Sequence, residues 1–425
     1  MNYIPVNNQM SEPSFSSVRW RMIAPTLFVL WVVGMFDKIG VAVISTNKAF
    51  LIDMNLVGKP VLIGSLVTGL LFSYGIGFFI WGWLTDHFGP KKCAIVGLVL
   101  WGLSTCLAAI APNFVTLLVS RICLGFAEAF LWPVSNSLTA RWFPLSERGR
   151  AKAIWINGIN VGAAFTGFLV LSLLHQFSWR IVFWVLTLLA WVICLPMVYW
   201  LVQDQPTNHK NVSQFEINHI MSEQLTQEDE KVKIKVKGVL SSSFWMLILS
   251  YIASTIGFYG LSTWFPSYLV IMKHFNANQT SSYMVLAYMV ALIAVVFVGM
   301  HTDKTQKKAI WLAGSFVAAL VCLLFAINLS SAITDAIMIA IAIAFVQITT
   351  LTIIGLMHSM SSTERIGTST GIATGFTDVV AAFGPTIMGA LIAFDHGSYV
   401  FAFMFLIGIF VIGALGGYIL QRQSY

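Results

Sequence analysis

The chain has 425 residues, of which 58% are hydrophobic and only 10% are charged, and its formal net charge is +7. Soluble domains carry roughly 25% charged residues, so this composition excludes an ordinary soluble protein. A net positive charge can indicate a nucleic-acid partner, but we expect none here, because the cations are arranged by membrane topology.

Apolar stretches of about 20 residues recur along the chain, which is the length a helix needs to cross about 30 Å of hydrocarbon. They predict an all-α membrane protein in which twelve spans bring both termini to one side. The predicted spans lie near residues 20–43, 61–84, 91–111, 114–137, 152–173, 179–202, 243–269, 281–301, 309–328, 332–357, 367–393 and 398–420.

The lysines and arginines outside these spans indicate the orientation. Most fall on the side that holds both termini, whereas the other side receives Lys48, Lys59, Arg180 and Lys273. By the positive-inside rule both termini are cytoplasmic. The first 18 residues are polar and show no cleavable signal peptide. We therefore expect a multi-pass protein of the inner (cytoplasmic) membrane.

A polar segment, 203–240, separates spans six and seven. It divides the chain into a tail (1–18), a bundle (19–202), this linker, a second bundle (241–421) and a short tail (422–425). The linker contains QFEINHIMSEQLTQEDE, which could form a short amphipathic helix, and then KVKIKVK, a basic strip suited to anionic lipid head groups. The alternative is a solvated connection between the two bundles.

The two halves of the chain repeat each other at a constant offset of 217 residues (for example 303 − 86). Seven residues share this offset: Gly82, Asp86, Lys91, Glu147, Arg148, Gly158 and Gly167 recur as Gly299, Asp303, Lys308, Glu364, Arg365, Gly375 and Gly384. The repeat predicts two pseudo-symmetric six-helix bundles. Parallel repeats of this kind are a transporter architecture, with the substrate site between the halves.

Charged residues within the spans are concentrated in the first half. Asp37, Lys38, Arg121 and Glu128 correspond at the same offset to uncharged residues, and the second half adds Asp378. A charge at membrane depth costs several kcal/mol, on the order of 3, so such residues usually mark a functional site.

The loop between spans two and three, GWLTDHFGPKK, resembles the G-x-x-x-D-x-x-G-x-K/R-K/R motif of the major facilitator superfamily. The resemblance implies the major facilitator fold and an ionic latch that stabilises one of two alternating states. The latch would use Asp86, Lys91 and Lys92, with Asp303 and Lys304 in the repeated loop GMHTDKTQKK. The alternative is that these loops only set topology and cap helices.

A narrower resemblance rests on GMFDKIGVAV, LFSYGIG, GFAEAFLWPVSN, RWFPLSERGRAKAI, GFYGLSTWFPSYL and GTSTGIATGFTDVVAAFGPTIMG. These segments look like the anion:cation symporter family, which implies proton-coupled movement of small organic anions. The family's functional residues in helices one, two and four match Asp37, Lys38, Tyr74, Arg121 and Glu128. Lysine at position 38 departs from the family's usual arginine.

The charged residues within the spans suggest how proton binding is coupled to substrate binding. We expect Asp37 to pair with Arg121 when no proton is bound, and proton uptake on Asp37 to release Arg121 and Lys38 for a substrate carboxylate. Glu128, about 10 Å deeper at 1.5 Å per residue, would be the second proton site. The alternatives are a structural hydrogen bond for Glu128 and an internal ion pair for Asp37 and Lys38.

The less charged side of the substrate site should set the specificity for substrate. Asp378 stands where many family members have a neutral asparagine, and it could bind either a proton or a substrate amine. The neutral candidates for substrate contact are Asn157, Asn160, Tyr259, Trp264 and Gln347.

The predicted function is proton-coupled uptake of a small organic anion or zwitterion by alternating access. The proton gradient would be the driving force, with no cofactor and no metal. Expected partners are a small-molecule substrate and membrane lipids, and the protein is expected to be a monomer. The alternatives are an exporter or exchanger of the same fold (drug, siderophore or phosphate-ester antiport) and a membrane receptor or scaffold that has lost transport. An enzyme is not expected.

Overall fold

The computed structural model describes residues 17–229, 242–305, 307–328, 331–360 and 366–423, with the backbone alone for 222–229, 303, 358–360 and 366–372. Within these residues, twelve helices are long and apolar enough to cross a membrane, which confirms the predicted number. They are Arg19–Ile44, Pro60–Phe88, Pro90–Ala109, Phe114–Trp142, Leu145–Gln176, Trp179–Leu201, Ser242–Met272, Ala277–Thr302, Lys308–Asn328, Ala332–Met357, Ala373–Phe394 and Val400–Arg422.

Some spans are assembled from more than one helical segment. The first half comprises a π-helical turn (Arg19–Ile23), α1 (Ala24–Ile44), α2 (Lys48–Asp53), α3 (Pro60–Phe88), α4 (Pro90–Ala109), α5 (Phe114–Glu128), α6 (Leu131–Trp142), α7 (Leu145–Gln176), α8 (Trp179–Leu188), a second π-helical turn (Leu189–Cys194) and α9 (Leu195–Leu201).

The remaining elements follow in the same way. They are a 3-10 turn (Pro206–Asn208), α10 (Gln214–Asp229), α11 (Ser242–Ser267), a π-helical turn (Tyr268–Met272), α12 (Ala277–Thr305), α13 (Lys308–Asn328), α14 (Ala332–Met360), α15 (Ile366–Ala381), α16 (Gly384–Phe394) and α17 (Val400–Arg422).

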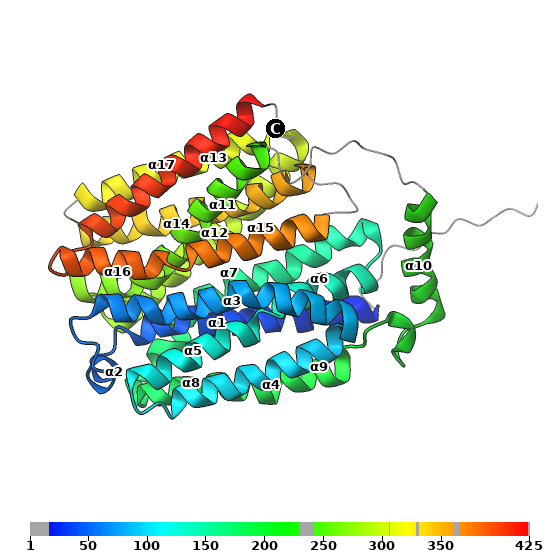
Figure 1. Cartoon of the computed structure of the whole chain (residues 1–425), viewed down its shortest axis with the longest axis horizontal. Coiled ribbons are helices and arrows are strands. Elements are labelled where there is room, and N and C mark those ends of the chain that lie inside the picture. Colours follow the sequence, from blue (N-terminus) through cyan, green and yellow to red (C-terminus); the bar gives the residue numbers. More distant parts are fainter. Residues whose placement is uncertain (1–16, 230–241, 306, 329–330, 361–365, 424–425) are drawn as a thin grey trace, which may run out of the picture.

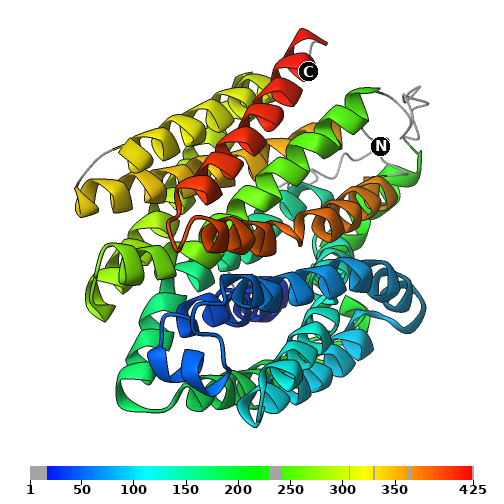
Figure 2. The same ribbon diagram turned by 60° about the vertical axis from the view of Figure 1, so that its left-hand side comes forward.

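The two halves lie against each other, with the first half below the second in Figure 1. The linker helix α10 stands across the helix ends on the right, and α2 lies at the left. We call these the linker end and the α2 end. Figure 2, with the α2 end turned toward the viewer, shows the same two layers.

The helix boundaries reproduce the sequence repeat. The first and last residues of α12, Ala277 and Thr305, follow those of α3, Pro60 and Phe88, by 217 residues (277 − 60 and 305 − 88). This agreement confirms the two pseudo-symmetric six-helix bundles. The repeated residues 364 and 365 lie outside the described residues.

Span four is broken, although its sequence predicts one continuous helix. Helix α5 ends at Glu128 and α6 begins at Leu131. Proline at position 133 explains the break, because a proline has no N–H and its ring clashes with the carbonyl four residues earlier, here that of Ala129. Glu128 therefore sits at a helix end in the middle of the membrane-spanning region.

Helix α10 is attached to the first half through buried charges. Arg19 lies 2.8 Å from Glu147 at the start of α7 and 2.8 Å from Glu216 of α10. The backbone N–H groups of Val18 and Arg19 also donate to the Glu216 carboxylate, at 3.2 and 3.3 Å. The linker thus contains the predicted helix, and the first turns of that helix are docked on the first half through Glu216. The basic strip, residues 231–237, lies outside the described residues.

Candidate functional site

A buried ion pair joins α1 to the end of α5. The Lys38 ammonium lies 2.6 Å from Glu128 Oε2, and the two side chains are 2% and 0% exposed. The ammonium also sits 4.4 Å from the centre of the Tyr74 ring on α3, an arrangement in which the ring face attracts the cation. Lys38 and Glu128 were both predicted site residues, but their pairing was not predicted from the sequence.

Asp37 and Arg121 are neighbours, but they do not form the predicted pair between carboxylate and guanidinium. Asp37 Oδ2 instead accepts a hydrogen bond from the Trp101 indole of α4 at 2.7 Å. Arg121 Nη2 donates to the backbone carbonyl of Asp37 at 2.9 Å. The predicted pair does not form because the Asp37 side chain points toward α4, so that its backbone carbonyl is the group that Arg121 of α5 contacts.

Several polar atoms of this cluster are buried without a hydrogen-bond partner in the described part of the chain. They are Asp37 Oδ1, Glu128 Oε1 and two guanidinium nitrogens, Arg121 Nε and Nη1. Buried polar groups are normally paired, since an unpaired one costs roughly 1–3 kcal/mol. Unused donors and acceptors on opposite charges are what a binding site for a polar ligand requires.

The second half contributes Asp378 from α15. Its side chain is buried, with 8% of the residue exposed, and it lies within electrostatic range of Lys38. Tyr74 and Tyr259 are within range of both Asp378 and Glu128. Side chains from α1, α3 and α5 therefore meet at Lys38, and Tyr259 of α11 and Asp378 of α15 lie within electrostatic range of this group.

Asn160 and Gln347 connect the halves directly. The Gln347 side-chain nitrogen of α14 donates to the Asn160 side-chain oxygen of α7 at 2.8 Å, and both residues are buried. Asn157, about one turn before Asn160 on α7, is half-buried. Two of the predicted neutral residues are thus brought into contact across the interface.

Trp264 lies in a tightly packed region. Its indole donates to the carbonyl of Pro385 at 3.0 Å, and only 2% of the residue is exposed. A Cβ at Gly389 would approach the Trp264 ring to 3.0 Å. The structure therefore gives Trp264 a packing role between α11 and α16, and its contact with substrate stays a prediction.

The halves are in close contact toward the α2 end, where α3 meets α16. The Thr68 hydroxyl donates to the Ala382 carbonyl at 2.6 Å and lies 2.7 Å from the Thr386 hydroxyl. A Cβ at Gly64 would lie 2.5 Å from the Pro385 carbonyl oxygen, so only glycine permits this approach. These contacts close the interface between α3 and α16.

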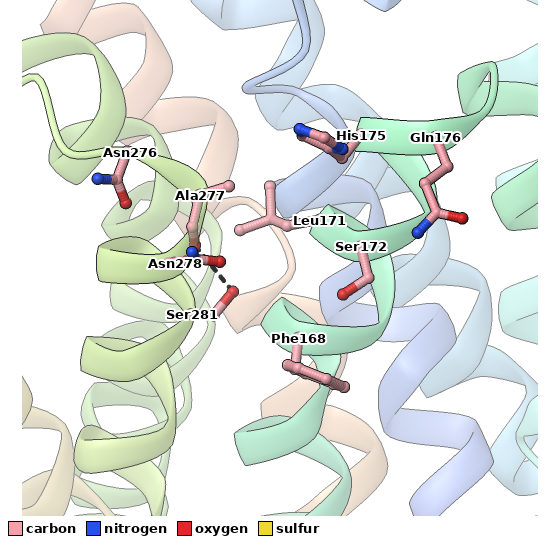
Figure 3. A pocket seen from close by; sticks show the side chains of 9 residues that line it. All are labelled: Phe168, Leu171, Ser172, His175, Gln176, Asn276, Ala277, Asn278 and Ser281. Carbon is pink, nitrogen blue, oxygen red and sulfur yellow. Dashed lines mark hydrogen bonds between the residues drawn. The ribbon is translucent and has the colours of Figure 1, made fainter.

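A pocket of about 420 Å³ lies between α7 and α12 at the α2 end, away from the buried charges (Figure 3). Next to it α7 and α12 pack closely, since a Cβ at Gly167 would lie 2.7 Å from the Met284 sulfur. It is lined by Phe168, Leu171, Ser172, His175, Gln176, Asn276, Ala277, Asn278 and Ser281. Sequence reasoning did not identify this pocket, because its two walls are about a hundred residues apart in the chain.

The predicted latch residues lie at the linker end. Asp86 is exposed, and no ion pair of its side chain occurs among the described residues. The backbone N–H of Lys91 instead donates to Asp204 at the start of the linker, at 2.8 Å. Lys92 and Lys304 are exposed, and the Asp303 side chain lies outside the described residues. The latch stays a prediction for another conformation.

The described residues contain no group of three or more histidine, cysteine, aspartate or glutamate side chains that could hold a metal ion.

The family model of the Major Facilitator Superfamily matches residues 26–385 of the sequence. Curated relatives include a protein described as a probable sulfoacetate transporter, from Cupriavidus necator, which is 25% identical over 93% of this chain and 92% of its own length.

Two relatives from Bacillus subtilis are also similar. A hexuronate transporter is 25% identical over 92% of this chain and 93% of its own length. A protein described as a probable galactarate/D-glucarate transporter is 27% identical over 69% of this chain and 66% of its own length.

Solved structures share the fold at low identity. A bacterial homolog of the human lysosomal transporter Spinster, in an inward-facing conformation, has a TM-score of 0.74 and 15% identity over 94% of this chain and 96% of its own. A D-xylose-proton symporter has a TM-score of 0.74 and 17% identity over 93% and 96%.

Proposed function

Because this chain belongs to the Major Facilitator Superfamily, we propose that it takes up a small organic anion together with protons, by alternating access. Membership of the superfamily confirms that the protein is a multi-pass membrane transporter rather than an enzyme, and transporters of this kind need no cofactor. The coupling ion, the direction and the substrate are the parts that we propose.

The observation that carries the proposal is the buried pair of Lys38 and Glu128. Breaking a buried ion pair by neutralising one partner leaves the other charge uncompensated, which is strongly unfavourable. A proton that binds Glu128 would leave the Lys38 ammonium without its counter-ion. An incoming carboxylate or sulfonate restores the balance, so the anion and the proton enter the site together.

This scheme revises the order suggested by the sequence. Glu128, not Asp37, is the acid that holds a cation directly, so we assign it the first proton. Arg121 then supplies the second contact for the anion through Nε and Nη1, which are unpaired among the described residues. These two nitrogens lie on different edges of the planar guanidinium, and each can donate a hydrogen bond to an oxygen of the anion. Asp37, with Oδ1 free, remains a candidate for a second proton.

The relatives support the class of substrate. Their names specify sulfoacetate, hexuronates and galactarate or D-glucarate. All are small, highly polar organic anions with a carboxylate. A site with two cations and several hydroxyl and amide groups suits such molecules.

We further propose that the linker end faces the cytoplasm and that the protein works as a monomer in the inner membrane. Most loop cations lie on the side of the termini, as the positive-inside rule requires of cytoplasmic loops. The predicted latch of Asp86 with Lys91 and Lys92 would then form on the cytoplasmic side in a state in which that side is closed.

Uptake into proteoliposomes tests this function. Purified protein is given radiolabelled D-galacturonate, D-glucarate or sulfoacetate, with the lumen either alkaline relative to the bath or at equal pH. We expect accumulation of at least one of these anions only with the pH gradient, and loss of that accumulation in Glu128→Gln. Arg180→Gln, which changes an exposed cation, is the matched control.

Two results would refute the coupling. One is full proton-driven accumulation by Glu128→Gln. The other is transport that depends on a preloaded internal anion and ignores the pH gradient, which identifies an exchanger.

A further inference from the structure

Asp378 is a buried acid that the scheme for anion and proton does not use. Its carboxylate makes no hydrogen bond or ion pair with any side chain in the described part of the chain, although 8% of the residue is exposed. The second half offers a contrast in Asp335, which is fully buried but lies 2.5 Å from the Lys273 ammonium and accepts a hydrogen bond from Tyr268. Asp335 is therefore compensated within its own half, and Asp378 is not.

Helix α15 packs on α3 and α11, and groups on these two helices and on α1 interact electrostatically with Asp378. These groups are Lys38 of α1, Tyr74 of α3, and Tyr251 and Tyr259 of α11. Lys38 is the one cation among these groups, and its charge is already balanced by Glu128 at 2.6 Å. The remaining neighbours are tyrosines, whose hydroxyl groups and ring faces favour a cation or a hydrogen-bond donor.

We propose that Asp378 binds a protonated amine, so that the substrate is an organic anion that also carries an ammonium group. Burying a carboxylate without a partner is costly, and a ligand ammonium offsets this cost with a charge-assisted hydrogen bond. The nearby tyrosines would present hydroxyl groups or ring faces to the ammonium, as aromatic residues do in other cation sites.

The position of Asp378 gives the amine a mechanical role. The anionic group would bind Lys38 and Arg121 in the first half, and the ammonium would bind Asp378 in the second half. A zwitterion therefore bridges the two bundles, whereas a simple anion contacts charges on one side alone. The inference rests on the proposed function for the anion end and adds the chemistry of the other end.

Matched ligands test the amine site. The first pair is D-gluconate and 2-amino-2-deoxy-D-gluconate, in which an amine replaces the hydroxyl at C2. The second is sulfoacetate and 2-aminoethanesulfonate, in which an amine replaces a carboxylate. Binding to purified full-length protein is measured by calorimetry and by the shift in melting temperature. We expect the aminated member of at least one pair to bind about tenfold more tightly to the native protein.

Substitutions of Asp378 test whether the preference for the aminated ligand comes from the Asp378 carboxylate. In Asp378→Asn the aminated ligand should lose about tenfold in affinity, while its partner without the amine changes by less than about twofold. Asp378→Glu keeps the charge and should retain most of the preference, which covers the case in which the asparagine variant does not fold. Asp395→Asn, an acid outside the spans, is the control and should change neither ligand.

Three results would overturn the amine site. The first is a native protein that prefers the ligand without an amine in both pairs, and the second is an Asp378→Asn variant that binds both ligands of a pair equally more weakly. The third is an Asp378→Asn variant that keeps gluconate uptake but loses its dependence on the pH gradient. The last result makes Asp378 a proton site. Proton-driven uptake of gluconate without any amine preference leaves the proposed function intact. An amine preference without proton-driven uptake refutes only the coupling.

Discussion

The two halves of the molecule share a backbone plan but differ in how they carry charge in the membrane. Helices α3 and α12 have the same length and the same offset. The first half nevertheless buries four charged side chains in a cluster within its spans, and the second half adds Asp378. The first-half residues Asp37, Lys38, Arg121 and Glu128 correspond at the same offset to Ser254, Thr255, Met338 and Phe345.

The difference teaches that the fold does not need the buried charges. The second half builds the same helices with hydroxyl and apolar side chains at the equivalent positions. Ser254 and Thr255 are buried there, at 0% and 8% exposure, and Met338 and Phe345 are half-buried. Charges that the architecture can omit, and that are expensive to bury, are best explained by function. The experiments below test that distinction, starting with the largest expected effect.

Breaking the first-half ion pair should have the largest effect. Lys38→Met leaves Glu128 as a buried charge without its cation, which should cost about 3–5 kcal/mol of stability and abolish transport. The double variant Lys38→Met/Glu128→Gln should recover much of the stability and none of the transport. Melting temperature in detergent and uptake in proteoliposomes measure the two effects.

The equivalent position in the second half provides the control. Thr255→Val should change the melting temperature little and leave uptake close to native. If Lys38→Met melts at the native temperature, or if Thr255→Val is equally damaging, the contrast between the halves is wrong.

Joining the halves should block transport without unfolding either of them. Thr68 and Thr386 have hydroxyl oxygens 2.7 Å apart, so Thr68→Cys/Thr386→Cys should form a disulfide that holds α3 against α16. Alternating access requires this contact to open. We expect loss of uptake after mild oxidation and its return with a reductant, measured beside each single cysteine variant. Unchanged uptake in the verified cross-linked protein would mean that this contact does not open.

The docked linker helix should show an intermediate effect. Glu216 pairs with Arg19, so Glu216→Gln removes charged hydrogen bonds that are worth about 1.5–3 kcal/mol. We expect faster protease cleavage within the linker and a modest fall in uptake. Gln214→Ala, on the exposed start of the same helix, is the control. Equal cleavage rates in the two variants would show that α10 is held by other contacts.

Trp264 provides a smaller test, within the second half. Trp264→Phe keeps an aromatic ring but removes the donor to the Pro385 carbonyl and part of the packing against Gly389, which should cost at least about 1 kcal/mol. We expect a lowered melting temperature with an unchanged apparent affinity for substrate. Tyr259→Phe, which changes a residue of the central cluster, should instead weaken substrate binding. A large rise in the half-saturating concentration for Trp264→Phe would restore the predicted contact with substrate.

The smallest effect concerns Asp53 at the α2 end, outside the spans. Hydrogen bonds from Trp179 and then Arg180 lower the pKa of Asp53 below its usual value. A depressed pKa means that the stabilisation is present above the unfolded pKa of about 3.9 and is lost as pH falls through the folded pKa.

Because the Asp53 side chain is 44% exposed, solvent screens its interactions and the effect should be small. Asp53→Asn should therefore melt slightly below the native protein at pH 7, and the difference should shrink toward pH 3. A difference that grows as the pH falls would reverse the sign of this linkage.

Much of the fold could be predicted from the sequence alone. The number of spans, the all-helical class and the two halves follow from apolar length and from the repeat, since each is a local property of the chain. The residues of the central cluster were also identifiable, because a charge within an apolar stretch is conspicuous before any helix is placed. The resemblance to a transporter family agrees with the superfamily match over residues 26–385.

Only the tertiary structure decided which of these charges meet. Asp37 and Lys38 are adjacent in sequence, yet they point toward α4 and toward α5, because successive residues on a helix face directions about 100° apart. The relative placement of α1 and α5 brings Lys38 to Glu128, 90 residues away in the chain, and the docking of Glu216 on Arg19 joins residues 197 positions apart. Helix rotation and long-range packing have no local signal in the chain. The sequence therefore determined which charged residues lie in the membrane, and the packing of the helices determined how they pair.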